Sequence, residues 1–132
     1  MPSPIEAKLL SFFDGMPTSA SFTVGAEAGD VINVAVQLKG IGGADLNVRS
    51  TLSFYLSADA NGDGIGTAPS SGIAIGTDGL MSEFTANLAG LVTSEADGDI
   101  DINFSEAGAL TLYLVLVLPN GKRAISGAIT FV

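Results

Sequence analysis

The sequence predicts an all-β protein, an antiparallel β-sandwich of immunoglobulin-like architecture with about seven strands. Apolar and polar residues alternate with a period of two in several segments, and Gly, Asp, Asn and Ser separate these segments. No segment of useful length after residue 20 has the period of a helix. The chain of 132 residues is long enough for one domain with its own core. A small closed barrel is the alternative arrangement for the same strands.

Four segments carry the strand pattern most clearly, because every second residue in them is apolar. They are residues 31–39, 50–57, 99–104 and 110–118. A strand points successive side chains to opposite faces, so each segment buries one face against a core. Residues 110–118 carry apolar side chains on the second face too, so we expect this strand to be central and covered on both sides. Weaker strand patterns lie at residues 19–24, 72–76 and 83–88.

Asn120 and Gly121 predict a β-hairpin between the strand that begins at residue 110 and the C-terminal segment. Both residue types tolerate the positive φ of a two-residue hairpin turn, whose twist matches that of the flanking strands. With these two residues as the loop, the large apolar side chains of both strands fall on one face. The pairs predicted by this register are Leu116 with Ile125, Leu112 with Ile129, and Leu110 with Phe131.

Residues 1–18 are expected to form an N-terminal arm beside a β-sandwich domain at residues 19–132. Three prolines restrict the backbone of the arm, and its apolar side chains are too many for a free tail. We expect the arm to pack along its own sandwich or to insert into a neighbouring subunit as an anchor. The candidate partner-binding residues are Ile5, Leu9, Leu10, Phe12 and Phe13.

The N-terminal segment lacks the basic start and the uninterrupted apolar run of a secretory signal peptide, so none is predicted. The longest apolar stretch, residues 112–118, is far shorter than the ~20 residues that span a bilayer. We therefore expect a soluble protein that is made in a cytoplasm.

The composition points away from catalysis and away from nucleic acid. The chain has no Cys, His or Trp, which removes thiolate and imidazole nucleophiles, bases and metal ligands. Its 14 acidic and 5 basic residues give a formal net charge of −9, which repels nucleic-acid phosphates and anionic membranes. No phosphate loop, nucleophile elbow or dinucleotide-binding glycine motif occurs. We therefore expect no enzymatic activity, no nucleic-acid partner and no membrane partner.

Residues 59–64 match the first half of an EF-hand calcium loop. Asp59, Asn61 and Asp63 place oxygen side chains at alternate positions, and the glycine at the sixth position permits a sharp turn. The twelfth position is Ser70, where the loop requires a bidentate Glu. One interpretation is a weak calcium site on these three residues. The other is a strand-connecting loop whose Asp and Asn side chains bond their own backbone. No other cofactor is expected.

A second acidic cluster lies between Glu95 and Glu106. As residues of one strand, Asp97, Asp99 and Asp101 would share a face, with neighbours about 7 Å apart. Three interpretations are open: a solvated sheet edge that prevents aggregation, a cation site shared with the first loop, or a charged contact with a basic partner.

Several segments resemble small immunoglobulin-like virion proteins of tailed bacteriophages, which occur on heads as decoration (cement) proteins or head fibres. The segments that carry the resemblance are VAVQLK at 34–39, LSFYLS at 52–57 with DANGD at 59–63, TSEADGDIDI at 93–102, and YLVLVLPNGK at 113–122. The resemblance covers residues 19–132. It implies a sandwich that sits on a capsid surface, and it brings no catalytic residues.

The function implied by the resemblance is that of a structural virion protein, made in the host cytoplasm, which binds and stabilises the major capsid lattice. A homotrimer would match the threefold positions of such a lattice. A tail or baseplate component is one alternative. A calcium-dependent surface-binding module, for host adhesion or glycan binding, is another.

Overall fold

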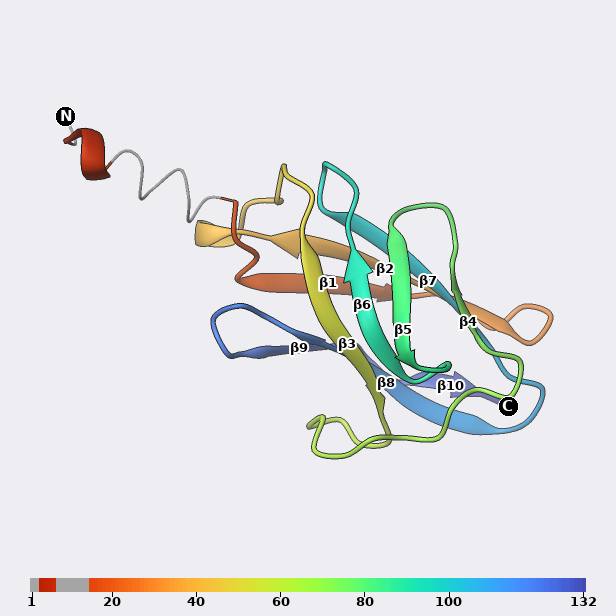
Figure 1. Cartoon of the computed structure of the whole chain (residues 1–132). Coiled ribbons are helices and arrows are strands. Elements are labelled where there is room, and N and C mark those ends of the chain that lie inside the picture. Colours follow the sequence, from red (N-terminus) through yellow and green to blue (C-terminus); the bar gives the residue numbers. More distant parts are fainter. Residues whose placement is uncertain (1–2, 7–14) are drawn as a thin grey trace.

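The computed structural model describes residues 3–6 and 15–132 of the chain. Two antiparallel β-sheets pack against each other, as Figure 1 shows. This confirms the predicted immunoglobulin-like β-sandwich, and the closed barrel is wrong because the strands divide between two sheets. None of the described helices is long and apolar enough to cross a membrane.

The smaller sheet has four strands in the order β1-β2-β7-β4. Their bounds are Ser19–Val24 for β1, Val31–Lys39 for β2, Asp99–Ser105 for β7 and Ile73–Ile75 for β4. In β2 and β7 the even-numbered residues are buried and the odd-numbered residues face outward. The period-two pattern of the sequence therefore assigns the inner face of this sheet correctly. A short 3-10 helix, Ile41–Gly43, follows β2.

The larger sheet has the order β10-β8-β3-β6-β5, and β9 also pairs with β8. The bounds are Ile129–Phe131 for β10, Leu110–Val117 for β8, Thr51–Ser57 for β3, Ala89–Thr93 for β6, Leu80–Thr85 for β5 and Arg123–Ile125 for β9. Strand β8 lies inside this sheet, between β3 on one side and β9 and β10 on the other.

The described residues form ten strands, against the seven or so expected from the sequence. The strand predicted at residues 83–88 is wrong: a hairpin of β5 and β6 occupies this region, and its turn interrupts the predicted strand. Asn87 adopts a φ of 60° in that turn, and Leu88 N donates a hydrogen bond of 3.1 Å to Thr85 O. Asn tolerates this left-handed conformation better than most residues, so it ends β5 here.

One apolar core fills the space between the sheets. Its largest fully buried side chains are Phe54, Phe104, Phe131, Ile32, Leu38, Leu46, Leu56, Ile100, Ile102, Leu112, Leu114 and Leu116. Both sheets contribute, and Leu46 enters from the segment that joins them. Truncation of any of the three phenylalanines to alanine would cost about 3–5 kcal/mol, because such a site collapses only in part.

The register of the C-terminal hairpin confirms two predicted pairs and corrects the third. Leu112 pairs with Ile129 and Leu110 with Phe131, as predicted. Leu116 does not pair with Ile125: Val115 pairs with Ile125, and Leu116 pairs with Ala124. The hairpin loop at residues 119–121 is the cause of this shift.

That loop has three residues instead of two. Leu118 N donates to Lys122 O at 2.9 Å, and Gly121 N donates to Leu118 O at 3.0 Å. Of the loop residues only Gly121 has a positive φ, 83°, whereas a two-residue turn of the predicted type requires a positive φ at two positions. Pro119 explains the choice, since its fixed φ suits the first turn position and it has no N–H to donate to Lys122, its partner in the two-residue arrangement.

One extra residue then restores the predicted pairing. Ser126 N donates to Leu114 O and Leu114 N donates to Ser126 Oγ, both at 2.9 Å, so these two residues are opposite each other. Ile129 pairs with Leu112, so the second strand uses three residues where β8 uses two. This bulge turns the side chains of β10 back toward the core.

Gly121→Ala is expected to lower the free energy of unfolding by about 1 kcal/mol, because a Cβ disfavours the positive φ of this residue. Gly64→Ala is the matched control, since its Cβ would meet nothing within 4 Å and its φ is outside that region. Urea denaturation measures both values. Equal losses for the two variants would contradict the role assigned to Gly121.

Candidate functional site

The loop that resembles a calcium site is organised by its own backbone. Asp59 Oδ1 accepts hydrogen bonds from Asn61 N at 2.9 Å and from Asp63 N at 3.1 Å. Asn61 and Asp63 are exposed. Among the residues that the structure describes, no group of three or more His, Cys, Asp or Glu side chains is placed to hold a metal ion. The hydrogen bonds of Asp59 are those of a strand-connecting loop in which a side chain bonds the backbone of its own loop.

This loop also covers the outer face of the larger sheet. Tyr55, Val115 and Ile125 form a row across β3, β8 and β9. Tyr55 Oη donates a hydrogen bond of 2.6 Å to Gly62 O, and a Cβ on Gly62 would lie 3.3 Å from both Val115 and Ile125 side chains. Val115 is therefore fully buried although it faces away from the core. The expectation that β8 is central is confirmed, and its outer face is fully covered at Val115, whereas Tyr113 and Val117 are half-buried and Thr111 is exposed.

The cover explains why Ile125 faces outward. In the predicted register Ile125 would oppose Leu116 on the inner face, where the structure places Ala124. In the observed register the Ile125 side chain packs beside Val115 beneath the loop. The Arg123 guanidinium lies 5.8 Å from the centre of the Tyr55 ring, which adds a cation–π contact at the rim of this cover.

Asp59→Ala is expected to lower the free energy of unfolding by about 1–2 kcal/mol in the presence of chelator, because two backbone N–H groups lose their acceptor. Asp63→Ala is the matched control, since its side chain is exposed and the loop uses only its backbone N–H. Thermal unfolding in chelator and in millimolar calcium measures both. A rise in Tm with calcium that Asp63→Ala removes would contradict this account and establish a calcium site.

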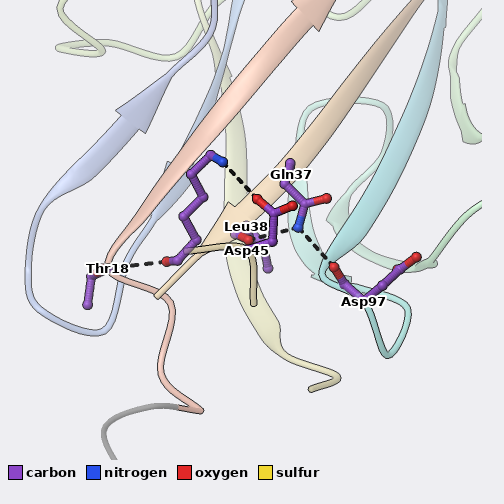
Figure 2. Close-up of polar contacts among 6 residues, drawn as sticks. Thr18, Gln37, Leu38, Asp45 and Asp97 are labelled. Atoms are coloured by element: carbon purple, nitrogen blue, oxygen red, sulfur yellow. Dashed lines mark hydrogen bonds and ion pairs between the residues drawn. The ribbon is translucent and has the colours of Figure 1, made fainter. Parts of the chain in front are cut away.

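The turn at residues 95–98 holds the start of the second acidic cluster against β2. Figure 2 shows Gln37 Nε2 donating to Asp97 O and to Leu38 O, both at 2.9 Å. Gly98 adopts a φ of 81°, and a Cβ there would lie 2.8–3.1 Å from Gln37 Nε2, Leu46 O and Leu38 O. Only glycine fits this position, so the turn has a fixed shape.

A second set of contacts in Figure 2 fixes the end of β2 beside the N-terminal segment. Lys39 Nζ forms an ion pair of 2.8 Å with Asp45 Oδ1. Thr18 N donates to Lys39 O at 2.8 Å, and the Thr18 hydroxyl lies 3.5 Å from the same oxygen. Pairing with β2 thus begins at Thr18, just before β1.

The acidic cluster does not form one strand face as predicted. Asp99 and Asp101 lie on β7 and face outward, which confirms their shared face. Asp97 lies in the preceding turn, so its place in the strand is wrong. The interpretation of a sheet edge is also wrong, because β7 lies between β2 and β4. A cation site shared with Asp59 is wrong too, since the two groups lie on the outer faces of opposite sheets.

Asp101 accepts hydrogen bonds that join β7 to the segment after β4. Asp78 N donates to its Oδ1 at 2.6 Å, Thr77 N at 2.9 Å, and Asn33 Nδ2 donates to its Oδ2 at 2.8 Å. Partial burial alone would raise the pKa of Asp101, but the hydrogen bonds from Asp78, Asn33 and Thr77 outweigh it and lower the pKa. This carboxylate is a structural acceptor.

Asp99 is the opposite case on the same strand face. Partial burial, and then the negative charges of Asp97, Asp78 and Asp45, raise the pKa of Asp99 above its ordinary value. Its charged form is therefore disfavoured in the folded protein. The two neighbouring carboxylates contribute to stability with opposite signs.

Asp101→Asn is expected to lower the free energy of unfolding at pH 7 by about 1–3 kcal/mol. The reason is that the hydrogen bonds that Asn33, Thr77 and Asp78 donate to the Asp101 carboxylate become weaker or are lost. The lowered pKa means that this contribution is present above about pH 4 and is lost as the pH falls through the folded pKa. Asp99→Asn is expected to raise stability at pH 7 by about 0.5 kcal/mol. That gain disappears as the pH falls through the raised folded pKa of Asp99.

Urea denaturation of both variants at pH 7 and pH 3 measures these effects. The two substitutions remove the same charge from one face of one strand, so each is the control of the other. Equal signs at pH 7 would contradict the roles given to the two carboxylates.

The predicted partner-binding residues are described only in part. Ile5 is 72% exposed, and Leu9, Leu10, Phe12 and Phe13 lie outside the described residues. Residues 4–6 form a helical turn that the sequence reasoning missed. Glu6 N donates to Ser3 Oγ at 3.2 Å, and Ser3 N donates to Glu6 Oε2 at 3.3 Å. This reciprocal pair is a capping box, and the Ser-x-x-Glu spacing with Pro4 at the first helical position was its signal.

A groove between β4 and β5 is a further feature that the sequence reasoning missed. It has a volume of about 580 Å³, and its lining includes Ile73, Ile75, Leu80, Met81 and Glu83. β4 and β5 are the end strands of their sheets, so the groove opens along one side of the sandwich. Its two sides come from strands of different sheets, which no local pattern brings together.

No protein-family model matches the chain, and the sequence comparison with curated proteins gives no match. Among solved structures, the fold is similar to a cohesin module from a family 33 glycoside hydrolase of Clostridium perfringens ATCC13124. The likeness covers 87% of this chain and 96% of that chain, with 12% sequence identity and a TM-score of 0.43.

Proposed function

We propose that the chain is a structural protein of a tailed-bacteriophage virion, a decoration (cement) protein that binds the major capsid protein and stabilises the capsid lattice. The resemblance to immunoglobulin-like virion proteins over residues 19–132 supports the proposal, as does the β-sandwich that these residues form. The protein performs no catalytic step in this function. Many weakly bound copies act together on a lattice, since each bound contact raises the effective concentration of the next.

The observation that carries the proposal is the apolar surface of β5 at one side of the sandwich. Leu80 is 61% exposed and Phe84 is 71% exposed, although both belong to a strand of the larger sheet. Exposed apolar side chains beside an end strand mark a place where another protein packs. A virion protein that bridges capsid subunits needs such a surface.

Purified protein is expected to co-sediment with empty capsids of the phage that encodes it at micromolar concentration, and to raise their melting temperature. Binding that saturates at three copies of the protein per threefold position of the capsid would support a homotrimer. Phe84→Ser is expected to weaken binding about tenfold, because an apolar anchor leaves the interface. Ile41→Ser, which alters a 52% exposed apolar residue on the 3-10 turn, is the matched control.

Absence of capsid binding at micromolar concentration would overturn the proposal. Co-purification with tail or baseplate chains in place of capsid would assign the same sandwich to a tail component. Equal losses for Phe84→Ser and Ile41→Ser would remove β5 from the interface.

A further inference from the structure

The two open sides of the sandwich differ in chemistry. On the side of β1 and β10, polar contacts tie the sheets: Asn120 Nδ2 donates to Thr18 O at 3.4 Å, and Val132 N donates to Glu27 Oε2 at 3.1 Å. On the side of β4 and β5 lies the groove of about 580 Å³. That volume is far larger than the ~30 Å³ share of a single water molecule, so side chains can enter it.

The floor of this groove is apolar, and its rim carries a charge. Pairing with the buried Val92 and Gly90 of β6 puts Met81 and Glu83 on the inner side of β5. Ile73 and Ile75 pair with the buried Phe104 and Ile102 of β7, which places them on the inner side of β4. The structure gives Glu83 no hydrogen-bond or ion-pair partner within the described part of the chain.

The backbone of β5 is open to a further strand. β5 pairs with β6 on one side and ends the order of the larger sheet on the other. Residues 80–83 keep a regular register before the bulge between Glu83 and Thr85. Lys and Pro, two common protections of an end strand, are missing from Leu80–Thr85. The regular part therefore presents unpaired backbone groups beside an apolar floor.

The charge around the groove selects the partner. Glu83 is in the lining of the groove, whose described residues include no Lys or Arg, and both strands of the groove lie in the span from Ser50 to Gly121, which has nine acidic residues and no basic one. The preceding cation, Arg49, is 3.2 Å from Glu95 in an ion pair. A second copy of the chain would bring one anionic surface against another, which is unfavourable. A basic segment is complementary.

We propose that the groove between β4 and β5 binds an extended segment of a partner protein that carries apolar residues and a Lys or Arg on one and the same face, at every second position. The segment adds as a strand beside β5, so its backbone bonds the open side of that strand. Its apolar side chains enter the groove over Ile73, Ile75 and Met81, and a basic side chain meets Glu83. The inference rests on the proposed function only for the identity of the partner, a capsid protein.

The first test uses the full chain and a blocked nine-residue peptide in which valine and lysine take turns on one strand face and threonine fills the other face. Nuclear magnetic resonance titration is expected to shift the amide signals of β4 and β5, with a Kd of about 1 mM or tighter. Glu83→Lys is expected to weaken binding at least about tenfold, because it places a cation against the basic segment. Asp63→Lys makes the same charge change in the loop over the outer face of the larger sheet, which does not line the groove, and is expected to change Kd less than about twofold.

Two further probes separate strand addition from general charge attraction. A peptide methylated on alternate backbone nitrogens keeps its charge but loses half of its donors, and it is expected to bind at least about tenfold more weakly. A peptide with glutamate in place of each lysine is expected not to bind. Absence of binding by the valine–lysine peptide, equal effects of the two Lys substitutions, or equal binding of the methylated peptide would overturn the inference. Self-association that Glu83→Lys abolishes would also overturn it, in favour of a second copy.

Capsid co-sedimentation distinguishes this inference from the proposed function. If wild-type protein and the Glu83→Lys variant bind capsids equally, the groove is not the contact and the inference fails while the proposed function stands. If the peptide binds the groove but capsids do not bind the protein, the inference stands and the proposed function fails.

Discussion

Burial of β8 on its inner face, and at Val115 on its outer face as well, is the constraint on which the rest of the sandwich depends. The inner face is part of the core between the sheets, and Val115 on the outer face is equally buried. Val115 is covered by the loop at Gly62 and by Ile125, which has to face outward to reach it. The three-residue turn lets Ile125 face outward beside Val115. The bulge after Ser126 then turns the side chains of β10 back toward the core.

The acidic residues are largely organisers of loops. Asp59 and Asp101 accept from backbone N–H groups of nearby turns. Glu106 does the same just after β7, where hydrogen bonds from Ser70 and Gly108 lower its pKa. Such acceptors hold a carboxylate in its charged form without a cation nearby. A chain with few basic residues therefore remains folded at a net charge of −9, and Glu83 differs from the others in facing the open groove.

The sequence predicted those strands whose buried face is determined by their own alternation of apolar and polar residues. The strands β2, β3, β7 and β8 follow from the alternation of apolar residues, because a period of two determines which face is buried. The turn at Asn87 was missed because alternation continued through it, and the tolerance of Asn for positive φ decided the outcome. The cover over Val115 depends on a contact between segments far apart in the sequence, and the groove arises because the consecutive strands β4 and β5 join different sheets. Their residues carry no pattern that distinguishes them from ordinary loop and edge positions.

The span without Lys or Arg has a consequence for how the molecule can be observed. Trypsin cuts after those two residues, so everything from β3 to β8 leaves the protein as one fragment, residues 50–122. Amine-reactive cross-linkers find no lysine there before Lys122, and maps based on them would leave this span of the chain blank whatever it contacts. Reagents that couple to carboxylates, or proteases that cut beside Asp and Glu, would report on it directly.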